Sequence, residues 1–395
     1  MKRRLVIFSA SYPFGLTETF LHNEVMYLND YFSIEIYPLL KKNQSSLPQQ
    51  IPRGIRYFDP LLPRSYFRRI LLGLFNFSPI QIFLKDLFTV FRSKDPIYSL
   101  KEWFLYMVTY RAVYANKRFR SAIKGSDIVY FYWGNFPISL IAGNNNLFVR
   151  VHGGEVNFER HKGYIPSIRQ KILAKGVVYL PISEDAYRRI HLVNKDAVCI
   201  LSRLGVVYKG RNPRPSDDAS IRIVSCSNVI GLKRLHLIIQ ALKQISDITI
   251  KWTHFGDGNL LDKIKEQATQ LPRNIAVEFR GRVDNQEVLE FYRAVPIDLF
   301  VNVSETEGVP VSIMEALSFG IPCFATDVGG TSEILNGIGG KVVPKDFEIV
   351  ELSKYICEIR DVAQYKDLRN GAFSLWKERC VADENYKLLL KTFSE

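Results

Sequence analysis

Short apolar runs alternate with helical patterns along almost the whole chain of 395 residues. The first half contains "RLVIFS", "SIEIYPLL", "DIVYFYW", "NLFVRVHGG" and "VVYLPIS", and the second contains "IRIVSCS", "ITIKWTHFG", "IAVEFRG", "IDLFVNVS", "PCFATDV" and "GKVVP". Strands that alternate with helices form parallel sheets with helices on both faces. The sequence therefore predicts an α/β fold built from two doubly wound parallel sheets in tandem.

The alternation lapses between Lys195 and Ile221, where "KGRNPRPSDDAS" is rich in Pro, Ser and charge, as in a connection between domains. We place an N-terminal domain at 1–208 and a C-terminal domain at 209–375. A last helical segment, 376–395, is expected to pack back toward the N-terminal domain. Open α/β sheets bind ligands at the carboxyl ends of their strands, so a central cleft between the domains is the expected site.

Composition narrows the class of protein. A chain with 47% hydrophobic and 24% charged residues is globular rather than disordered. Its five cysteines are scattered and form no C-x-x-C pair, which argues against a disulfide framework or a zinc site and favours a reducing cytoplasm. The apolar run near the start, Leu5 to Ser9, is too short for a signal peptide and is predicted to be a buried strand.

Positive charge is concentrated in the first half of the chain. Residues 1–205 carry 29 Lys and Arg against 14 Asp and Glu, whereas the remainder carries 24 against 26. A basic half favours a polyanionic partner, either nucleic acid or an anionic membrane surface. A solvated basic face without a partner is the alternative.

Residues 64–120 interrupt the pattern with an aromatic, basic and apolar segment. Its longest uncharged stretch, Ile70 to Leu84, contains Asn, Ser, Pro and Gln and is shorter than the roughly 20 apolar residues of a membrane span. The segment is predicted to be a helical insertion that either lies on a bilayer or packs on the sheet as an ordinary helical pair. On a bilayer, the residues facing anionic headgroups would be Arg64, Arg68, Arg69, Arg92 and Lys94.

Two glutamates, Glu307 and Glu315, flank the start of a predicted short helix, "PVSIMEALSF". Pro310 suits the first helical position, and Gly320 with Pro322 suits the helix end. The free N–H groups and the dipole at a helix start favour an anion such as phosphate. At 1.5 Å per residue the five residues from Val311 to Glu315 extend roughly 7.5 Å, so the carboxylates can reach opposite ends of one elongated ligand.

A nucleotide sugar fits this arrangement, with its diphosphate at the helix start, its hexose toward Glu307 and its ribose toward Glu315. Carboxylates suit both ends because each accepts several hydrogen bonds from hydroxyls. Lone glutamates are by default solvated surface residues. Their spacing around Gly308 and Pro310 favours a binding site instead, whereas Glu305 is interpreted as structural because its distance from Glu315 does not match.

The stretch "EGVPVSIMEALSFGIPCFATDVGGTSEI" resembles the E-x7-E signature of the retaining GT-B glycosyltransferases, in particular glycosyltransferase family 4. The segments "VHGGEV", "PISE", "CSNVIGLKRLHLIIQAL", "FGDGNL" and "FRGRV" resemble other parts of that family in the same order, from about 145 to 335. The opening "SYPFGLTETFLHNEVMYL" is similar to the P-x-x-x-ETF-x-x-x-E start of polysaccharide-assembly members. The resemblance implies the GT-B fold, with two Rossmann-like domains facing a central cleft.

The resemblance also implies roles for individual residues of the donor site. Glu307 would contact the donor hexose, Glu315 the ribose and Lys233 the diphosphate. The backbone amides that would contact sugar and phosphate belong to Gly308, Val309, Pro310 and Val311. Taken alone, Lys233 is better explained as a surface lysine at a helix start, whereas its strand-loop-helix context favours phosphate binding.

One donor-site position departs from the family pattern. Many relatives have an arginine where this chain has Asn228. Neutralising the phosphate charge therefore requires another basic residue, either Arg234 or one in the first domain. Arg282, in "FRGRV", is near where the resemblance places the nucleotide base.

His152, in "VHGGEV", occupies a position from which family histidines reach the reacting sugar, and Gly153 and Gly154 would leave room for substrate. As a lone residue, His152 is also explained as a hydrogen-bonded core histidine. Gly15 lines the cleft or forms a plain turn. The catalytic candidates are therefore His152, Lys233 and Glu307.

The implied reaction is retaining transfer of a hexose from a nucleotide diphosphate donor, a UDP-sugar, to a glycan or lipid-linked saccharide in cell-surface polysaccharide biosynthesis. The enzyme would work peripherally on the inner face of the cell membrane, without a cofactor and without a metal, since no D-x-D motif is present. Alternatives are a sugar-nucleotide epimerase or phosphorylase of the same fold, or a basic nucleic-acid-binding protein. No zinc finger or RNA-binding aromatic signature supports the last of these.

Overall fold

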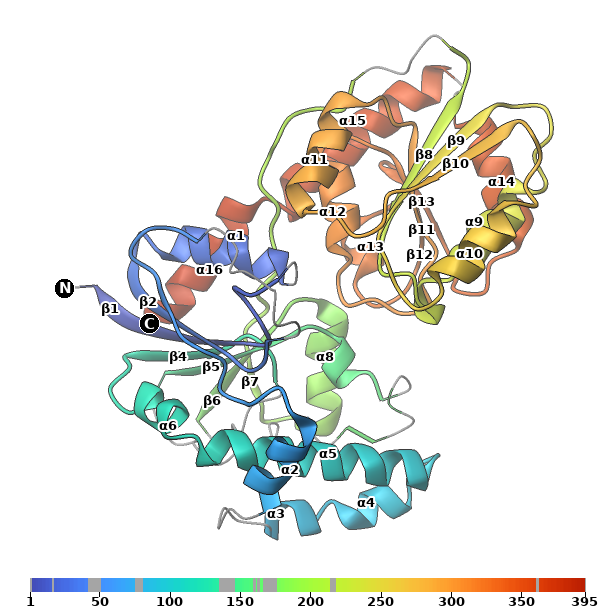
Figure 1. The fold of residues 1–395 in the computed structure, drawn as a ribbon. Coiled ribbons are helices and arrows are strands. Elements are labelled where there is room, and N and C mark those ends of the chain that lie inside the picture. Colours follow the sequence, from blue (N-terminus) through green and yellow to red (C-terminus); the bar gives the residue numbers. More distant parts are fainter. Residues whose placement is uncertain are drawn as a thin grey trace. The chain divides into compact units, whose positions relative to one another are not determined.

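The computed structural model contains two compact units, each built around one parallel sheet (Figure 1). Unit 1 comprises Met1–Arg203 and Tyr386–Glu395, and unit 2 comprises Leu204–Asn385. The predicted fold of two doubly wound sheets is confirmed. The structure describes residues 2–15, 18–41, 51–74, 81–134, 146–158, 161, 164–165, 176–213, 218–359 and 362–394.

The sheet of unit 1 has the order β3-β2-β1-β4-β5-β6-β7, with parallel pairing between all neighbours. Its strands are β1 (Arg3–Ser9), β2 (Phe32–Pro38), β3 (Arg56–Tyr57), β4 (Ile128–Phe131), β5 (Leu147–Val151), β6 (Val177–Pro181) and β7 (Val198–Cys199). The order reverses between β1 and β4, which makes the loops after these two strands the switch point of the sheet.

The sheet of unit 2 repeats this arrangement in the order β10-β9-β8-β11-β12-β13, again with parallel neighbours. Its strands are β8 (Ile221–Cys226), β9 (Ile250–Phe255), β10 (Ile275–Phe279), β11 (Leu299–Asn302), β12 (Cys323–Thr326) and β13 (Gly340–Val343). Here the switch point lies between β8 and β11. All eleven apolar runs identified in the sequence form strands, whereas the two-residue edge strands β3 and β7 are too short to give a pattern.

Helices cover both faces of the sheet of unit 1, and β1 shows why. Leu5 and Ile7 point into one apolar cluster with α1 and α16, while Val6 and Phe8 point into another with α5, α6 and α8. This period of two is that of a strand buried on both sides. The helices are α1 (Thr19–Leu28), α2 (Tyr66–Leu74), α3 (Gln81–Leu84), α4 (Leu87–Phe91), α5 (Pro96–Ala115), α6 (Lys117–Ile123), α8 (Glu184–Val193) and α16 (Ala382–Ser394).

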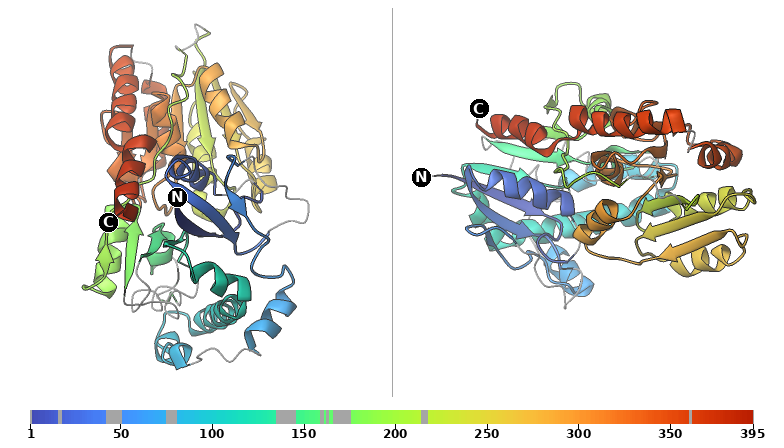
Figure 2. Two further views of the ribbon diagram at one scale, coloured as in Figure 1. Left: turned by 90° about the vertical axis from the view of Figure 1, so that its left-hand side faces the viewer. Right: turned by 90° about the horizontal axis from the view of Figure 1, so that it is seen from above.

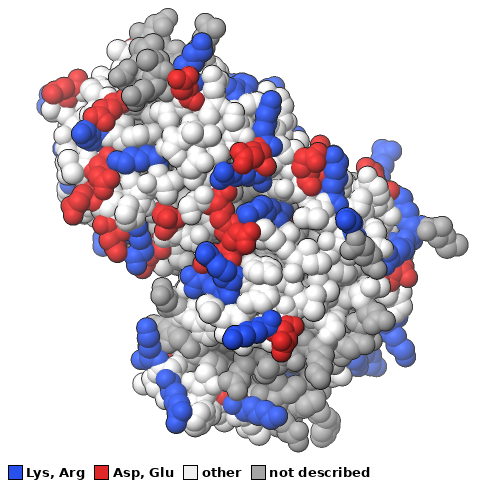
Figure 3. Space-filling view, turned by 180° about the vertical axis from the view of Figure 1, so that it is seen from behind, with Lys and Arg blue, Asp and Glu red and all other residues white. Residues whose placement is uncertain are grey.

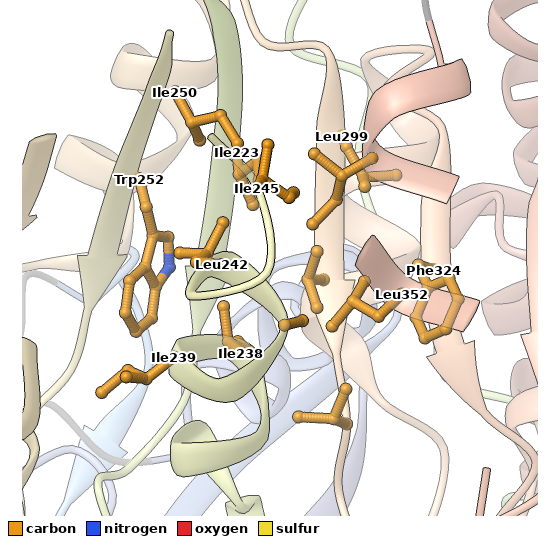
Figure 4. Close-up of a cluster of buried hydrophobic side chains, with 14 of the residues drawn as sticks. Ile223, Ile238, Ile239, Leu242, Ile245, Ile250, Trp252, Leu299, Phe324 and Leu352 are labelled. Carbon is orange, nitrogen blue, oxygen red and sulfur yellow. The ribbon is translucent and has the colours of Figure 1, made fainter. Parts of the chain in front are cut away.

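In unit 2, α9, α10 and α14 pack on one face of the sheet around the fully buried Trp252 (Figure 4). Figure 4 shows Ile238, Ile239 and Leu242 of α9 pointing toward the strands, and each such side chain contributes roughly 1.5–3 kcal/mol by burial. The helices of this unit are α9 (Leu235–Leu242), α10 (Leu261–Ala268), α11 (Asn285–Ala294), α12 (Val311–Ser318), α13 (Thr331–Ile334), α14 (Ile349–Glu358) and α15 (Val362–Arg379).

The division into units differs by a few residues from the boundaries placed on the sequence. The chain leaves unit 1 after Arg203 rather than after residue 208, because regular strand structure has already ended at β7. At the other end, only Tyr386–Glu395 belongs to unit 1, and α16 begins at Ala382 rather than at 376. The ring of Phe393 lies 5.1 Å from that of Tyr130 and 4.8 Å from that of Phe148, which fixes α16 on the sheet of unit 1.

The segment 64–120 forms α2, α3, α4, α5 and the first part of α6, with α2 and α4 gathered against the long α5 (Figure 2). Helix α5 begins at Pro96, and the side chain of Asp95 accepts a hydrogen bond from the Tyr98 N–H at 3.0 Å, which caps it. Gly73 is the only buried residue of α2, and a Cβ there would overlap the carbonyl oxygen of Val108. The backbones of α2 and α5 are therefore in direct contact.

Among the described residues, no helix has the length and apolar character required to cross a bilayer.

A fully buried ion pair joins α1 to the sheet of unit 1. The guanidinium of Arg150 on β5 contacts a carboxylate oxygen of Glu24 at 2.8 Å, with neither side chain exposed. The hydroxyl of Tyr130 donates to the other Glu24 oxygen at 2.6 Å, and Arg150 also donates to the Ser202 carbonyl oxygen at 2.7 Å. A buried charge is tolerated only when it is paired and hydrogen-bonded, as it is here.

Glu24→Ala would leave the Arg150 charge buried without its partner. We expect the free energy of unfolding to fall by about 3–5 kcal/mol, measured by urea denaturation of the purified protein. The double variant Glu24→Leu with Arg150→Met removes both charges and should recover much of that loss. If the free energy of unfolding of Glu24→Ala lay within about 1 kcal/mol of the wild-type value, this account of the pair would be contradicted.

Candidate functional site

The candidate residues of unit 2 gather at the carboxyl edge of its sheet. Asn228 and Lys233 follow β8, Glu307 follows β11, and Arg282 follows β10. Because β8 and β11 are neighbours at the switch point, the loops after them diverge and leave their polar groups accessible to a ligand. The parallel topology thus brings together residues that lie far apart in the sequence.

Helix α12 begins at Val311, one residue later than predicted, and Pro310 is its N-cap residue. The backbone of Pro310 is extended, and its carbonyl oxygen accepts from the N–H groups of Ile313 at 3.0 Å and Met314 at 3.3 Å. No side chain of the described residues caps the helix start. The first N–H groups of α12 therefore remain available to an external acceptor.

Lys233 and Glu307 are in direct contact. The Lys233 ammonium, in the short 3-10 helix η3 (Gly231–Lys233), lies 2.5 Å from Oε1 of Glu307. Asn302, the last residue of β11, donates to the same oxygen at 3.2 Å. Oε2 of Glu307 accepts no hydrogen bond from the described part of the chain. One carboxylate oxygen is thus held by protein groups and the other is open to a ligand hydroxyl.

A pair of glycines supports the turn that carries Glu307. Gly329 has φ +59°, and a Cβ there would overlap the carbonyl oxygen of Glu307 and lie 2.8 Å from that of Gly308. The N–H of Gly330 donates to the Gly308 carbonyl oxygen at 2.6 Å. Only a residue without a side chain allows this approach, so the "GG" after β12 holds the turn against the sheet.

Glu315 lies inside α12, where only 7% of the residue is exposed. Asn285, the first residue of α11, donates from its amide to Oε1 of Glu315 at 2.9 Å. Burial raises the pKa of Glu315 to about 7, and the Asn285 hydrogen bond opposes the rise only in part. Oε2 of Glu315 has no partner among the residues that the structure describes.

Arg282 donates from Nη2 to Oδ1 of Asn228 at 2.9 Å. A guanidinium from the loop after β10 therefore lies beside the position where the family resemblance expects an arginine. Arg234 is engaged elsewhere, because it donates to the carbonyl oxygens of Val303 at 2.7 Å and Ser304 at 3.3 Å. Of the two residues, Arg282 has the freer guanidinium for a phosphate.

In unit 1, His152 follows β5 and lies among aromatic rings. Its ring is stacked on that of Trp133 at 4.2 Å and lies 5.4 Å from that of Phe20. Nε2 lies 3.0 Å from the Tyr132 carbonyl oxygen. Because a carbonyl oxygen only accepts hydrogen bonds, Nε2 carries the ring proton and donates it. His152 is 8% exposed. It is buried and hydrogen-bonded, as a core histidine would be, and it also lies at the carboxyl edge of the sheet, where a residue that contacts a ligand would lie.

Gly153 and Gly154 come next, with φ +84° at Gly153, and Gly15 has φ +78° in the loop after β1. All three glycines lie at the carboxyl edge of the unit 1 sheet, together with His152.

Two buried carboxylates that sequence reasoning did not single out order these unit 1 loops. Glu18 accepts from the N–H groups of Ala10, Ser11 and Tyr12 at 2.7–3.0 Å. The other, Glu155, accepts from the backbone of Gly134 at 2.5 Å and of His152 at 2.7 Å.

Glu18 belongs to "ETF" and Glu155 to "GGEV", so the signal was present in the motifs. Asn302 and Asn285, by contrast, gave no signal.

The arrangement in unit 2 can bind an anion flanked by hydroxyl groups. It offers helix N–H groups, an ammonium, a guanidinium and two carboxylates that each keep an oxygen open. No group of His, Cys, Asp and Glu suited to hold a metal ion occurs among the described residues.

Comparisons with known proteins find similarity to glycosyltransferases. Residues 209–367 match the family model described as Glycosyl transferases group 1. The O-antigen biosynthesis glycosyltransferase WbnH of Escherichia coli is 36% identical over 84 residues, which is 21% of this chain and 22% of the relative. The amylovoran biosynthesis glycosyltransferase AmsK of Erwinia amylovora is 24% identical over 209 residues, 49% of this chain and 50% of the relative.

The chain thus spans about half the length, or less, of these curated relatives. Over its full length it is similar in fold to the crystal structure of Anabaena Alr3699/HepE in complex with UDP, with a TM-score of 0.67 and 16% identity, covering 99% of each chain. This likeness shows a GT-B fold.

The raised pKa of Glu315 predicts a pH-dependent stability. Between its unfolded value near 4.5 and its folded value near 7 the native state holds a proton that the unfolded chain releases, so stability falls as pH rises. We expect urea denaturation to show a loss of up to roughly 3 kcal/mol between pH 4.5 and 8 that Glu315→Gln lacks. The exposed Glu305→Gln serves as control. Equal pH slopes for wild type and Glu315→Gln would refute the prediction.

Proposed function

We propose that the protein is a retaining, metal-independent glycosyltransferase that transfers a hexose from a UDP-sugar to a lipid-linked saccharide. The single observation that carries this proposal is the contact between Lys233 and Glu307 beside the uncapped start of α12. It brings a fixed cation from the segment after β8 to a carboxylate and free N–H groups in the turn before α12. A sugar diphosphate needs these three kinds of group together.

In this proposal the donor diphosphate lies at the N–H groups of Gly308, Val309 and Val311. Lys233 and Arg282 neutralise its charge, and the positive end of the α12 dipole adds to their effect. Charge develops on the phosphate as the bond to the sugar breaks, so a cation held in advance stabilises the transition state more than the bound donor. Glu307, which is itself held by Asn302, keeps Lys233 in position before the donor arrives.

The two glutamates hold the hydroxyl-bearing ends of the donor. Oε2 of Glu307 is open to accept from a hexose hydroxyl, and Oε2 of Glu315 from a ribose hydroxyl. Two ribose hydroxyls that donate to Glu315 would stabilise its charged form, which burial otherwise disfavours. Ligand binding thereby relieves the electrostatic cost of the buried carboxylate.

The chemical step exchanges one C–O bond for another on the same face of the sugar. The bond from the anomeric carbon to the donor phosphate breaks, the acceptor oxygen bonds to that carbon, and the acceptor proton passes to the departing phosphate. No protein general base is required. We assign His152, whose Nε2–H donates to the Tyr132 carbonyl oxygen, to contact with the reacting sugar.

The nucleotide and the pathway class are supported by relatives. HepE was crystallised with UDP and with UDP-glucose, which supports a UDP-sugar donor here. By their names, WbnH and AmsK work in O-antigen and amylovoran biosynthesis, which supports a role in cell-surface polysaccharide assembly. These relatives favour transfer over epimerase or phosphorylase chemistry and over nucleic-acid binding.

Glu307→Ala tests the catalytic proposal. We expect transfer from UDP-glucose or another UDP-hexose to fall at least about 100-fold, because the hexose loses its carboxylate partner, with an unchanged melting temperature. Glu305→Ala, which removes an exposed glutamate from the same loop, should keep its activity within about twofold. Release of UDP and labelled product report the turnover. Wild-type turnover by Glu307→Ala would refute the proposed role.

A lipid-linked acceptor implies contact with a membrane at its inner face, and α4 and the start of α5 supply a surface for it. Phe88 and Phe91 are each 63% exposed, and Ile97 is 85% exposed. Positions 88 and 91 lie on one face of α4. The guanidinium of Arg92 lies 4.0 Å above the ring of Phe88, a pairing that suits the boundary between headgroups and acyl chains.

The double variant Phe88→Ser with Phe91→Ser should lower the fraction of protein that sediments with phosphatidylglycerol vesicles by at least about threefold, since two aromatic anchors are lost. The matched control is Leu192→Ser with Val193→Ser, which removes two exposed apolar residues from α8. Equal sedimentation of both double variants would count against this surface.

A further inference from the structure

A pocket of about 700 Å³ lies at one edge of unit 1, between α2 and the loop that follows β3. Its floor is apolar, and its rim carries four cations. Floor residues include Leu61, Leu62, Leu71 and Leu72, and the rim cations are Lys41, Arg64, Arg68 and Arg118.

Backbone hydrogen bonds fix the floor of this pocket. The N–H of Leu61 donates to the Pro38 carbonyl oxygen at 2.9 Å, and the N–H of Leu62 to that of Leu39 at 3.1 Å. The side-chain amide of Asn116 donates to the Leu61 carbonyl oxygen at 2.6 Å. The opposite wall, α2, is held by the backbone contact of Gly73 with α5. The pocket is therefore built into the fold.

The rim is strongly positive. Among the described residues that line the pocket, Asp59 is the one carboxylate, against four cations. None of the four forms an ion pair among the described residues: Lys41 lies 5.0 Å above the ring of Phe14, and Arg118 donates to the Pro60 carbonyl oxygen at 3.1 Å. Nearby arginines behave differently, since Arg4 and Arg56 both pair with Glu35.

The charge belongs to a wider basic surface. The segment 64–120 has eleven Lys and Arg against three Asp and Glu. Figure 3 shows Lys and Arg over this end of unit 1 with few Asp and Glu among them.

An apolar floor under a cationic rim matches one kind of ligand, an anionic amphiphile. A free anion would gain nothing from the four leucines, and a neutral lipid would gain nothing from the four cations. A phosphate bonded directly to a hydrocarbon chain uses both. The excess of three positive charges matches a diphosphate better than the single charge of a phospholipid headgroup.

The pocket lies at the carboxyl edge of the unit 1 sheet, the edge at which the proposed function puts the reacting sugar. Lys41 follows β2 and Asp59 follows β3, so both come from carboxyl ends of strands, as do Gly15 and His152. Phe14, which lies under Lys41, belongs to the same loop as Gly15. A group held in the pocket is thus connected along one sheet edge to the loops around His152.

We propose that this pocket binds the diphosphate and the first hydrocarbon units of a lipid diphosphate that carries the acceptor saccharide. Arg64, Arg68, Lys41 and Arg118 hold the diphosphate, and the leucine floor holds the start of the chain. This inference rests on the proposed function for the saccharide that the lipid carries, but the pocket itself is independent of the donor site in unit 2.

Binding of farnesyl diphosphate to the full-length protein, measured by calorimetry with and without UDP, tests the proposal. We expect one site per chain that saturating UDP does not displace. Arg64→Gln with Arg68→Gln should weaken binding at least about tenfold, because two charged hydrogen-bond donors are lost. Lys94→Gln with Lys101→Gln removes the same charge from exposed positions outside the pocket and should change it by less than about threefold.

Two further measurements distinguish the contributions of the hydrocarbon chain and the diphosphate to binding. Leu71→Ser with Leu72→Ser should weaken farnesyl diphosphate but leave the weaker binding of inorganic pyrophosphate unchanged. Monomeric dihexanoylphosphatidylglycerol should bind less tightly than farnesyl diphosphate in the wild type. The proposal is overturned if farnesyl diphosphate does not bind, if both charge variants lose affinity equally, or if pyrophosphate or the phospholipid binds as tightly.

The UDP affinity of the same variants distinguishes this inference from the donor proposal. UDP contacts belong to unit 2, so Arg64→Gln with Arg68→Gln should leave the UDP dissociation constant unchanged. Failure of UDP to bind the wild type would end the donor proposal while leaving the pocket result to stand. Normal UDP binding without farnesyl diphosphate binding would end only the present inference.

Discussion

Parallel strand pairing at the two switch points is the constraint on which the rest of the structure depends. In unit 2 the pairing of β8 with β11 makes the loops after these two strands diverge from neighbouring strand ends. Lys233 and Glu307, 74 residues apart in the chain, meet there at 2.5 Å. The pairing of β1 with β4 repeats the arrangement in unit 1, where the Gly15 loop and Trp133 follow neighbouring strands.

Much of the fold follows from sequence because the central strands of these sheets are buried on both faces, and such a strand is a continuous apolar run in the sequence. The edge strands β3 and β7 were not predicted, because a strand of two residues shows no periodic pattern in the sequence. The start of α12 was predicted within one residue, since Pro310 fits either the N-cap or the first helical position.

The partners of the site residues were beyond prediction from one sequence. Asn302 and Asn285 hold Glu307 and Glu315 through contacts that depend on the register of β11 and on the start of α11. Arg282 reaches Asn228 only because β9 and β10 are paired in the sheet beside β8. Side-chain contacts of this kind arise from tertiary packing, and local helix and strand propensities do not predict them.

The path of α16 has a consequence for how the molecule can be divided. The chain passes from unit 1 to unit 2 after Arg203 and returns at Tyr386, so unit 1 is assembled from two separate pieces of the sequence. A fragment that stops at Arg203 would leave Tyr130 and Phe148 without the ring of Phe393. An isolated N-terminal half is thus an incomplete folding unit, and a circularly permuted chain that links the last helix to β1 would restore it.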